Sequence, residues 1–554
     1  MAGRVRDSYE SHRLHVSMSP PIPSAPRASR ADTVRFVIAG AVLITAQFAL
    51  ALSLRNFNFF NDDLEHVAYG RFFSSLYKRQ FDVHMPLGAL LSFLWGHAFG
   101  FSASLNRALA AALNSGILLT LLLLGRRAFS LAAGFIGAVA YLLLEVPLWA
   151  YLHLSEVPSV LFMLLGTVAI LRLESNLQLQ GPARARLALG VGALFGLAFM
   201  ARLLAVELFA LVVLVVTVGR VVGRSPGTPW LKLLALDAVW VSLGAVLPLL
   251  AFVGIFAAMG TLNDFIYWTL LHNMKAKTYV DPAGWIGHLN EPAIRALWRF
   301  ALCALAVSIV SYAVYWRRQE RTSRVALWLA WAGAIGGWVG ANPSGIGQLA
   351  FHAIPAFPFL GLAAGAGTVG LVRQALASQR SRKLIAGALA MLAALAVIGV
   401  GNSLWLPLTM TWKLARQFPV MGEFAWSEQV GRYIRDNSRP EDTLFIFGTW
   451  PLLYATSERN SATTFSIVFM DLVHYEEEML AQLRAAPPRF VVLNPKDFWF
   501  SHNVHALPRV RDYLLENYRV STAFPELLEP RTPENEQRVF RHPEISAAVA
   551  QPAP

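Results

Sequence analysis

Long apolar runs separated by short polar segments fill most of the chain as far as residue 408. A helix needs about 20 apolar residues to cross the hydrocarbon core of a bilayer. The runs that predict membrane-spanning helices are 36–54, 108–124, 131–151, 157–171, 187–201, 203–219, 233–259, 300–315, 325–340, 351–372 and 384–408. The shorter runs need tilt or close neighbours to fit. The pattern predicts a polytopic α-helical membrane protein with about 11 transmembrane helices.

Basic residues gather in the polar segments and set the predicted orientation. With the N-terminus in the cytoplasm, all the strongly basic segments fall on the cytoplasmic side, as cationic flanks require: 126–127, 172–186, 220–232, 317–324 and 373–383. The apolar stretch Met85–Phe101 would reverse this order if it crossed the membrane. We therefore expect it to lie in the interface, with Trp95 and His97 at headgroup depth.

Composition and charge narrow the class of protein. The chain is 55% hydrophobic and only 15% charged, whereas soluble domains carry about a quarter charged residues. Although the net charge is +13, no basic helix with interleaved aromatic residues occurs, so nucleic acid is not an expected partner. The single cysteine, Cys303, excludes an internal disulfide and a cysteine metal site. We predict a multi-pass protein of the inner (plasma) membrane.

The chain divides into three predicted parts. Residues 1–32 form a disordered cytoplasmic arm, 33–408 form the transmembrane domain with an outer loop at 55–107, and 409–554 form a C-terminal extracytoplasmic domain with a disordered tail. Helical patterns in this last part occur at 428–438 and 475–485, and strand patterns at 443–447, 490–493 and 518–524. The last part is thus a small α/β domain. It contains no recognisable catalytic motif, which favours a structural or acceptor-docking role.

Candidate chemistry concentrates just after the first predicted span. Asp62, Asp63, Glu65 and His66 place four titratable groups within five positions. A solvated loop is the ordinary explanation of such a charge run. These residues, however, lie between the aromatic-rich sequence FNFF at 57–60 and the predicted interfacial helix. A carboxylate at a low-dielectric boundary has a raised pKa, which suits a general base.

The order of short motifs resembles the glycosyltransferase C superfamily, in particular the protein O-mannosyltransferases and the bacterial aminoarabinose transferases of lipid A. In that family an acidic pair after the first span is followed by a basic residue and Pro before an apolar helix. The matching segments are Asp62–Asp63, His84–Leu87, Leu154–Pro158 and His352–Pro355 with Pro358. Two departures are Asp63, where the family has Glu, and Met85, which replaces a Pro. The resemblance covers roughly residues 36–365.

The resemblance implies a membrane glycosyltransferase with a glycosyltransferase C-like fold. It would move a hexose or pentose, with inversion, from a polyprenyl-phosphate-linked donor to a hydroxyl of a glycan, lipid or protein acceptor on the outer face. Asp62 would be the catalytic base and Asp63 would orient it or the acceptor. Glu156 would position the acceptor or serve as an alternative base.

The leaving phosphate needs fixed cations. His84, Arg202 and His352 are the candidate donor-phosphate-binding residues. Arg202 follows an apolar run at its outer end, where it could snorkel to the surface or bind phosphate, with Glu207 as its partner when no donor is present. Arg and His can stabilise a monophosphate without a cofactor. A divalent cation is compatible with the acidic cluster but not required.

Two other classes stay open. A transporter or flippase of a lipid-linked glycan would also place acids in the membrane, as Glu145 and Asp237 are placed here, although buried structural hydrogen bonding is the favoured role of both. Such proteins show paired repeats and broken helices, and no internal repeat is found. The third class is a structural membrane protein whose outer domain binds a partner. In the segment 260–299, Lys275, Lys277 and Tyr279 are weaker candidates for substrate contact.

Overall fold

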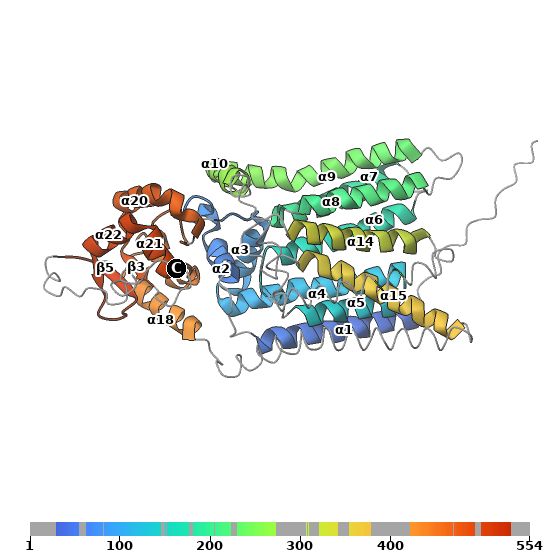
Figure 1. Ribbon diagram of the computed structural model, residues 1–554, viewed down its shortest axis with the longest axis horizontal. Coiled ribbons are helices and arrows are strands. Elements are labelled where there is room, and N and C mark those ends of the chain that lie inside the picture. The colour runs from blue at the N-terminus through green and yellow to red at the C-terminus, as the bar shows by residue number, and fades with distance from the viewer. Residues whose placement is uncertain are drawn as a thin grey trace, which may run out of the picture.

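The protein consists of a helical bundle with an α/β domain at one end (Figure 1). The computed structural model describes residues 29–54, 62–80, 82–145, 150, 152–176, 181–203, 205–222, 230–272, 306, 309, 321–341, 354–377, 422–468, 470–493 and 500–532. We call the end of the bundle next to the α/β domain the domain end, and the opposite end the far end.

The bundle is built from apolar helices that overlap the predicted runs. They are α1 (Arg30–Ser53), α4 (Ala103–Ala128), α5 (Leu131–Leu144), α6 (Glu156–Ser175), α7 (Gly181–Ala201), α8 (Ala205–Val222), α9 (Trp230–Ala258), α14 (Arg321–Ala341) and α15 (Phe357–Ala377). In the described part of the chain, 6 helices are long and apolar enough to cross a membrane. The prediction of a multi-pass membrane protein is confirmed. The predicted span 384–408 and most of 300–315 lie outside the described residues, so the count of eleven stays a prediction.

Glycines bring α7 and α9 into backbone contact. A Cβ built on Gly192 would lie 1.9 Å from the carbonyl oxygen of Val241, and one on Gly244 would lie 2.1 Å from that of Leu189. Apolar burial gives little drive for association in lipid, so membrane helices pack through small residues that allow such close approach. The two helices therefore form a tightly packed pair.

From α4 to α9, successive helices run in alternating directions, so the basic clusters between them meet at the far end (Figure 1). At this end Ser323, in the first turn of α14, donates a hydrogen bond to the carbonyl oxygen of Ala128 at the end of α4. The basic residues of the far end include Arg126, Arg127, Arg172, Arg184, Arg220, Arg324 and Arg373. The segments that the charge pattern places on one side do lie at one end.

A buried ion network joins four helices at the far end. Arg184 Nη2 lies 2.6 Å from Asp237 Oδ2, and Arg220 Nη2 lies 2.7 Å from the same oxygen. Arg220 Nε also donates to Glu174 Oε1 at 2.8 Å. Asp237 thus makes the buried polar contacts that were predicted for it. Glu145 does so through one oxygen, because its Oε2 accepts a hydrogen bond from Gln47 at 2.8 Å.

Short elements cover the domain end of the bundle: α2 (Asp62–Arg71), the 3₁₀ turn η1 (Phe73–Ser75), α3 (Leu87–Phe99), α10 (Leu262–Ile266) and the π-helical turn η2 (Tyr267–His272). α3 has 13 residues, which at about 1.5 Å per residue fall short of a hydrocarbon core of about 30 Å. The length agrees with the prediction that this stretch does not cross the membrane.

The α/β domain contains a five-stranded sheet in the order β2-β1-β3-β5-β4. Its elements are α18 (Gly422–Asp436), β1 (Thr443–Phe447), α19 (Leu452–Ser457), β2 (Asn460–Ser461), η6 (Met470–Tyr475), α20 (Glu476–Ala485), β3 (Phe490–Leu493), α21 (Phe500–Ala506), α22 (Pro508–Asn517), β4 (Tyr518–Val520) and β5 (Leu527–Pro530). β2, β1 and β3 are parallel, whereas β5 is antiparallel to both β3 and β4.

The strand predictions for 443–447 and 490–493 are confirmed. The prediction of a strand over 518–524 is wrong in length, because the strand ends at Val520 and the chain returns as β5. β2 has only two residues, which is too short to be predicted as a strand. β5 ends at Pro530 and does not alternate between apolar and polar residues, so it was not predicted either.

Candidate active site

The acidic cluster after the first span belongs to a helix. Asp62 and Asp63 are the first two residues of α2, where the helix dipole favours acidic residues. Glu65 and His66 follow in the same helix and are 7% and 3% exposed. The solvated-loop explanation is therefore wrong for these two residues, because their side chains are buried where α2 packs on the bundle.

His66 of α2 contacts His153, which precedes α6. The two ring centroids are 4.8 Å apart. Gly88 of α3 makes room for His66, since a Cβ there would lie 2.8 Å from the imidazole Cε1. The contact joins α2 to the segment just before α6, where His153 precedes Glu156 by three residues. Sequence reasoning missed His153, although it lies directly before the Leu154–Pro158 match.

Polar side chains from α3 and α4 fix His153. Its Nδ1 lies 3.1 Å from Ser92 Oγ and 3.0 Å from Asn106 Oδ1. An amide oxygen only accepts hydrogen bonds, so Nδ1 donates to Asn106 and Nε2 is left as the acceptor of a neutral ring. Nε2 has no hydrogen-bond partner among the described residues, and the same holds for His66 Nδ1.

Burial keeps both imidazoles uncharged. It lowers the pKa of His153 to about 3. It also lowers the pKa of His66 well below its ordinary value, and the neighbouring His153 adds to the effect. Desolvation penalises the charged imidazolium, so both rings are neutral at neutral pH.

His84 is oriented by Asp82. His84 Nδ1 lies 2.9 Å from Asp82 Oδ1, and the same oxygen accepts a hydrogen bond from the His84 backbone N–H at 2.7 Å. The Asp82 side chain is 1% exposed and that of His84 is 37% exposed. The His84 ring lies 6.4 Å from the ring of His66. The histidine is thus held at the edge of the buried cluster with one face open. Sequence reasoning missed Asp82, which lies just outside the matched segment.

Glu156 and Arg202 form a buried ion pair between α6 and α7. Glu156 is in the first turn of α6, and Arg202 directly follows the last residue of α7. They are 2% and 9% exposed, and Ser155 Oγ donates to Glu156 Oε2 at 3.2 Å. Glu156 reaches the end of α7 from the neighbouring helix, whereas the side chain of Glu207, the expected partner of Arg202, lies outside the described residues.

At the domain end of the bundle, His66 and His153 connect elements that carry several predicted site residues. Asp62 and Asp63 begin the helix that contains His66, His84 lies beside His66, and Glu156, which pairs with Arg202, follows His153 by three residues. His352, Lys275, Lys277 and Tyr279 lie outside the described residues, as do the side chains of Asp62 and Asp63. Within the part of the chain that the structure describes, no group of three or more His, Cys, Asp and Glu could hold a metal ion.

Comparison with solved structures places the fold. ArnT from Cupriavidus metallidurans in the apo state is similar, with a TM-score of 0.50 and 16% identity over 83% of this chain and 93% of that chain. The apo oligosaccharyltransferase of Archaeoglobus fulgidus has a TM-score of 0.50 and 12% identity over 88% of this chain and 73% of that chain. The chain therefore shares its fold with these two proteins. The resemblance is confirmed at the level of fold.

A further structure of the Cupriavidus metallidurans ArnT, bound to undecaprenyl phosphate, has a TM-score of 0.49 and 16% identity over 78% of this chain and 86% of that chain. No protein-family model matches the sequence, and no curated protein matches it either.

Proposed function

We propose that the protein is a membrane glycosyltransferase that moves a sugar from a polyprenyl-phosphate-linked donor to an acceptor hydroxyl. The observation that carries the proposal is the contact of His66 with His153. It joins the helix that begins with Asp62 and Asp63 to the ion pair of Glu156 with Arg202. A structure of ArnT, which shares the fold, was solved with undecaprenyl phosphate, so a polyprenyl phosphate is the donor lipid that we propose here.

Asp62 is the proposed base. The acceptor oxygen attacks the anomeric carbon from the side opposite the phosphate while Asp62 takes the hydroxyl proton. The bond from the anomeric carbon to the phosphate oxygen breaks, and its electron pair leaves with the polyprenyl phosphate. Such a base contributes a factor of about 10² to 10⁴ in rate. Asp63 is proposed to orient Asp62 or the acceptor.

Cationic groups stabilise the charge that grows on the leaving phosphate. Arg202, His84 and His352 are the proposed contacts, and a preorganised guanidinium in a water-poor site is effective for this purpose. The phosphate competes with Glu156 for Arg202. The same exchange frees the Glu156 carboxylate to position the acceptor. The reaction as drawn requires no metal ion.

The proposed orientation follows from charge. Basic residues resist translocation, so the far end with its arginines is assigned to the cytoplasm, together with the N-terminus. The domain end, the candidate active site and the α/β domain are then extracytoplasmic. This assignment requires that the chain crosses the inner membrane eleven times, as the sequence predicts.

Deletion of the gene, followed by mass spectrometry of envelope glycans, glycolipids and glycoproteins, tests the proposal. We expect one sugar modification to disappear. The wild-type chain and the control Asp512→Asn, an exposed acid of the α/β domain, should restore it, whereas Asp62→Asn should not. Restoration by Asp62→Asn would remove Asp62 from the role of base. An unchanged envelope together with substrate uptake into vesicles would favour a transporter.

A further inference from the structure

The α/β domain packs directly on α2. Leu64 and Val67 of α2 form one hydrophobic cluster with Leu452 and Ala455 of α19. Ala68 belongs to a second cluster, which includes residues of β1 and β3. The helix that begins with Asp62 is thus held between α3 on the bundle side and α19 on the domain side.

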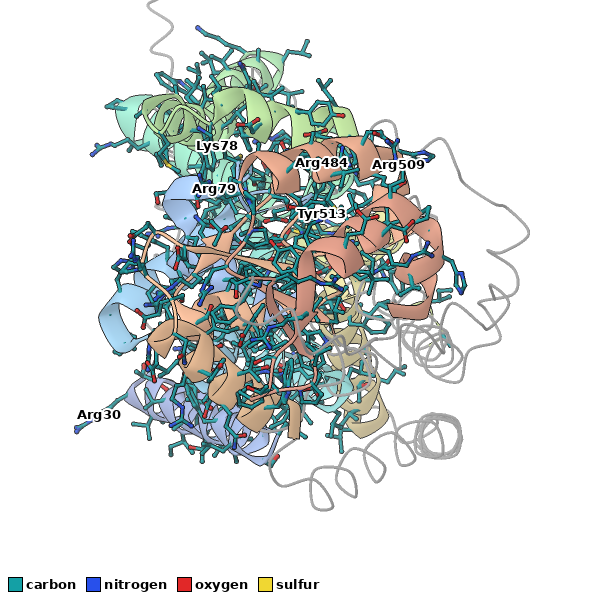
Figure 2. The ribbon with its side chains drawn as sticks, turned by 90° about the vertical axis from the view of Figure 1, so that its left-hand side faces the viewer. Arg30, Lys78, Arg79, Arg484, Arg509 and Tyr513 are labelled. Carbon is teal, nitrogen blue, oxygen red and sulfur yellow. The ribbon has the colours of Figure 1, made fainter. Side chains whose placement is uncertain are left out.

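Asn460 of β2 bridges the two ends of the turn that follows α2. Its Nδ2 donates to Ser75 Oγ at 2.8 Å, and its Oδ1 accepts from Gln80 Nε2 at 2.7 Å. Thr464 Oγ1 also donates to the carbonyl oxygen of Lys78 at 2.9 Å. Figure 2, viewed from the domain end, shows Lys78 and Arg79 of this turn beside the elements of the α/β domain.

The bridged turn contains a strained residue. Tyr77 has a φ of 68°, in the left-handed region, and its side chain is fully buried. A bulky residue in that region is energetically unfavourable and persists only where its surroundings hold it. Ser75 and Gln80, the two residues bridged by Asn460, flank Tyr77, and Tyr77 N–H donates to the Gln80 carbonyl oxygen at 2.9 Å. The domain therefore supplies part of what holds the turn.

Two further contacts complete the attachment. At the C-terminal end of α2, Arg71 Nη2 lies 2.9 Å from Glu458 Oε1. On the other side of the domain, the Tyr475 hydroxyl lies 3.0 Å from the Tyr267 hydroxyl and 3.1 Å from His272 Nδ1. The domain thus contacts two segments of the membrane part of the chain: α2, which follows α1, and η2, which follows α9 and α10.

We propose that the α/β domain is a clamp that positions α2, and with it Asp62 and Asp63, over the bundle, and that Asn460 is a positioning residue. This inference rests on the proposed function for the role of Asp62. It assigns the domain a part in catalysis that differs from acceptor docking. Loosening the clamp should lower turnover and leave binding of the donor phosphate to the bundle intact.

The full chain in lipid nanodiscs, with the substitution Asn460→Ala, tests the clamp. The control is Asn437→Ala, whose side-chain amide donates to the Tyr433 carbonyl oxygen within the domain. For Asn460→Ala we expect the α2 amides to exchange hydrogen about tenfold faster, while amides of β1 and β3 exchange as in the wild type. The Kd for undecaprenyl phosphate should be unchanged. In deletion cells the variant should restore the lost sugar modification at about a tenth of the wild-type rate.

The measurements distinguish failure of the clamp, failure of its role in catalysis and failure of the proposed function. Unchanged exchange in α2, or equally faster exchange in β1 and β3, would overturn the clamp. Full restoration of the modification despite a loosened α2 would overturn its catalytic role. If the wild-type chain binds no polyprenyl phosphate and its deletion alters no glycan, the proposed function fails, whereas the exchange result still decides whether the domain holds α2.

Discussion

Glu156 at the start of α6 and Arg202 at the end of α7 neutralise one another in a nearly solvent-free position. Burying a charge costs several kcal/mol, so each partner is tolerated because the other is present. Any anion that binds Arg202 has to replace a carboxylate already in place. In the proposed function, the pair therefore sets the affinity of the site for phosphate.

Replacing Glu156 by Gln should raise the affinity for undecaprenyl phosphate and lower sugar transfer. The guanidinium loses its competing carboxylate, and we expect a Kd about tenfold lower, equivalent to about 1.4 kcal/mol. Titration of the purified protein in nanodiscs measures the Kd. Glu156→Asp keeps the charge and is the control. A Kd that stays the same or rises in Glu156→Gln would show that Arg202 does not meet the phosphate.

Acid should destabilise the fold through its buried histidines. The pKa of His153 is about 3 when folded and about 6.5 when unfolded. Below pH 6.5 the unfolded chain therefore binds more protons, and the free energy of unfolding falls by about 1.4 kcal/mol per pH unit for this group, until pH 3 is approached. His66 adds to the effect in the same direction.

The substitution His153→Asn removes the titrating ring while keeping a polar group near Ser92. The loss of Tm between pH 7 and pH 5 should become smaller than in the wild type, as measured by thermal unfolding in detergent. His505→Asn, on α21 of the α/β domain, is the matched control and should leave the profile unchanged. Identical acid profiles for His153→Asn and the wild type would contradict the assignment.

Gly192→Ala should destabilise the bundle because the new methyl group meets the Val241 carbonyl oxygen. Overpacking of this kind costs about 1–3 kcal/mol. Gly190→Ala, on the same helix with nothing within 4 Å of the added Cβ, is the matched control and should change Tm little. Equal Tm values for the two variants would mean that α7 and α9 are not in backbone contact.

Asp237→Asn should lower thermal stability without altering affinity for undecaprenyl phosphate. Arg184 and Arg220 would then lose the carboxylate that they share, and Glu174 would pair with Arg220 alone. Breaking a buried pair costs about 3–5 kcal/mol. The exposed acid Asp512 again provides the control variant. A loss of phosphate affinity in Asp237→Asn at unchanged Tm would assign a functional role to the far end.

The apolar runs predicted the bundle well because lipid demands long uninterrupted hydrophobic segments, whatever their neighbours. The strands β1 and β3 were equally predictable, since both are short continuous apolar runs. Asp62 and Glu156 could be chosen as candidate catalytic residues because each closely follows a predicted membrane span. None of these inferences required knowledge of which segments touch.

Contacts between distant segments were not predictable. Asp82 and His153 have no local signature that separates them from other loop residues, and their roles arise from packing against His84 and His66. The pairing of Glu156 with Arg202 joins two different helices, and sequence proximity suggested only Glu207. Asn460 is joined to Ser75, which lies 385 positions earlier in the chain. No periodicity in either segment predicts that pairing.

The bridge from Asn460 to Ser75 and Gln80 also has a consequence for biosynthesis. α2 emerges from the ribosome long before β2 has been translated, so a nascent chain lacks the interactions that hold the turn around Tyr77. Its first extramembrane helix is therefore not fully held in its final place until the chain has been synthesised past β2. Prematurely terminated products would therefore carry the acidic pair without the architecture that orders it.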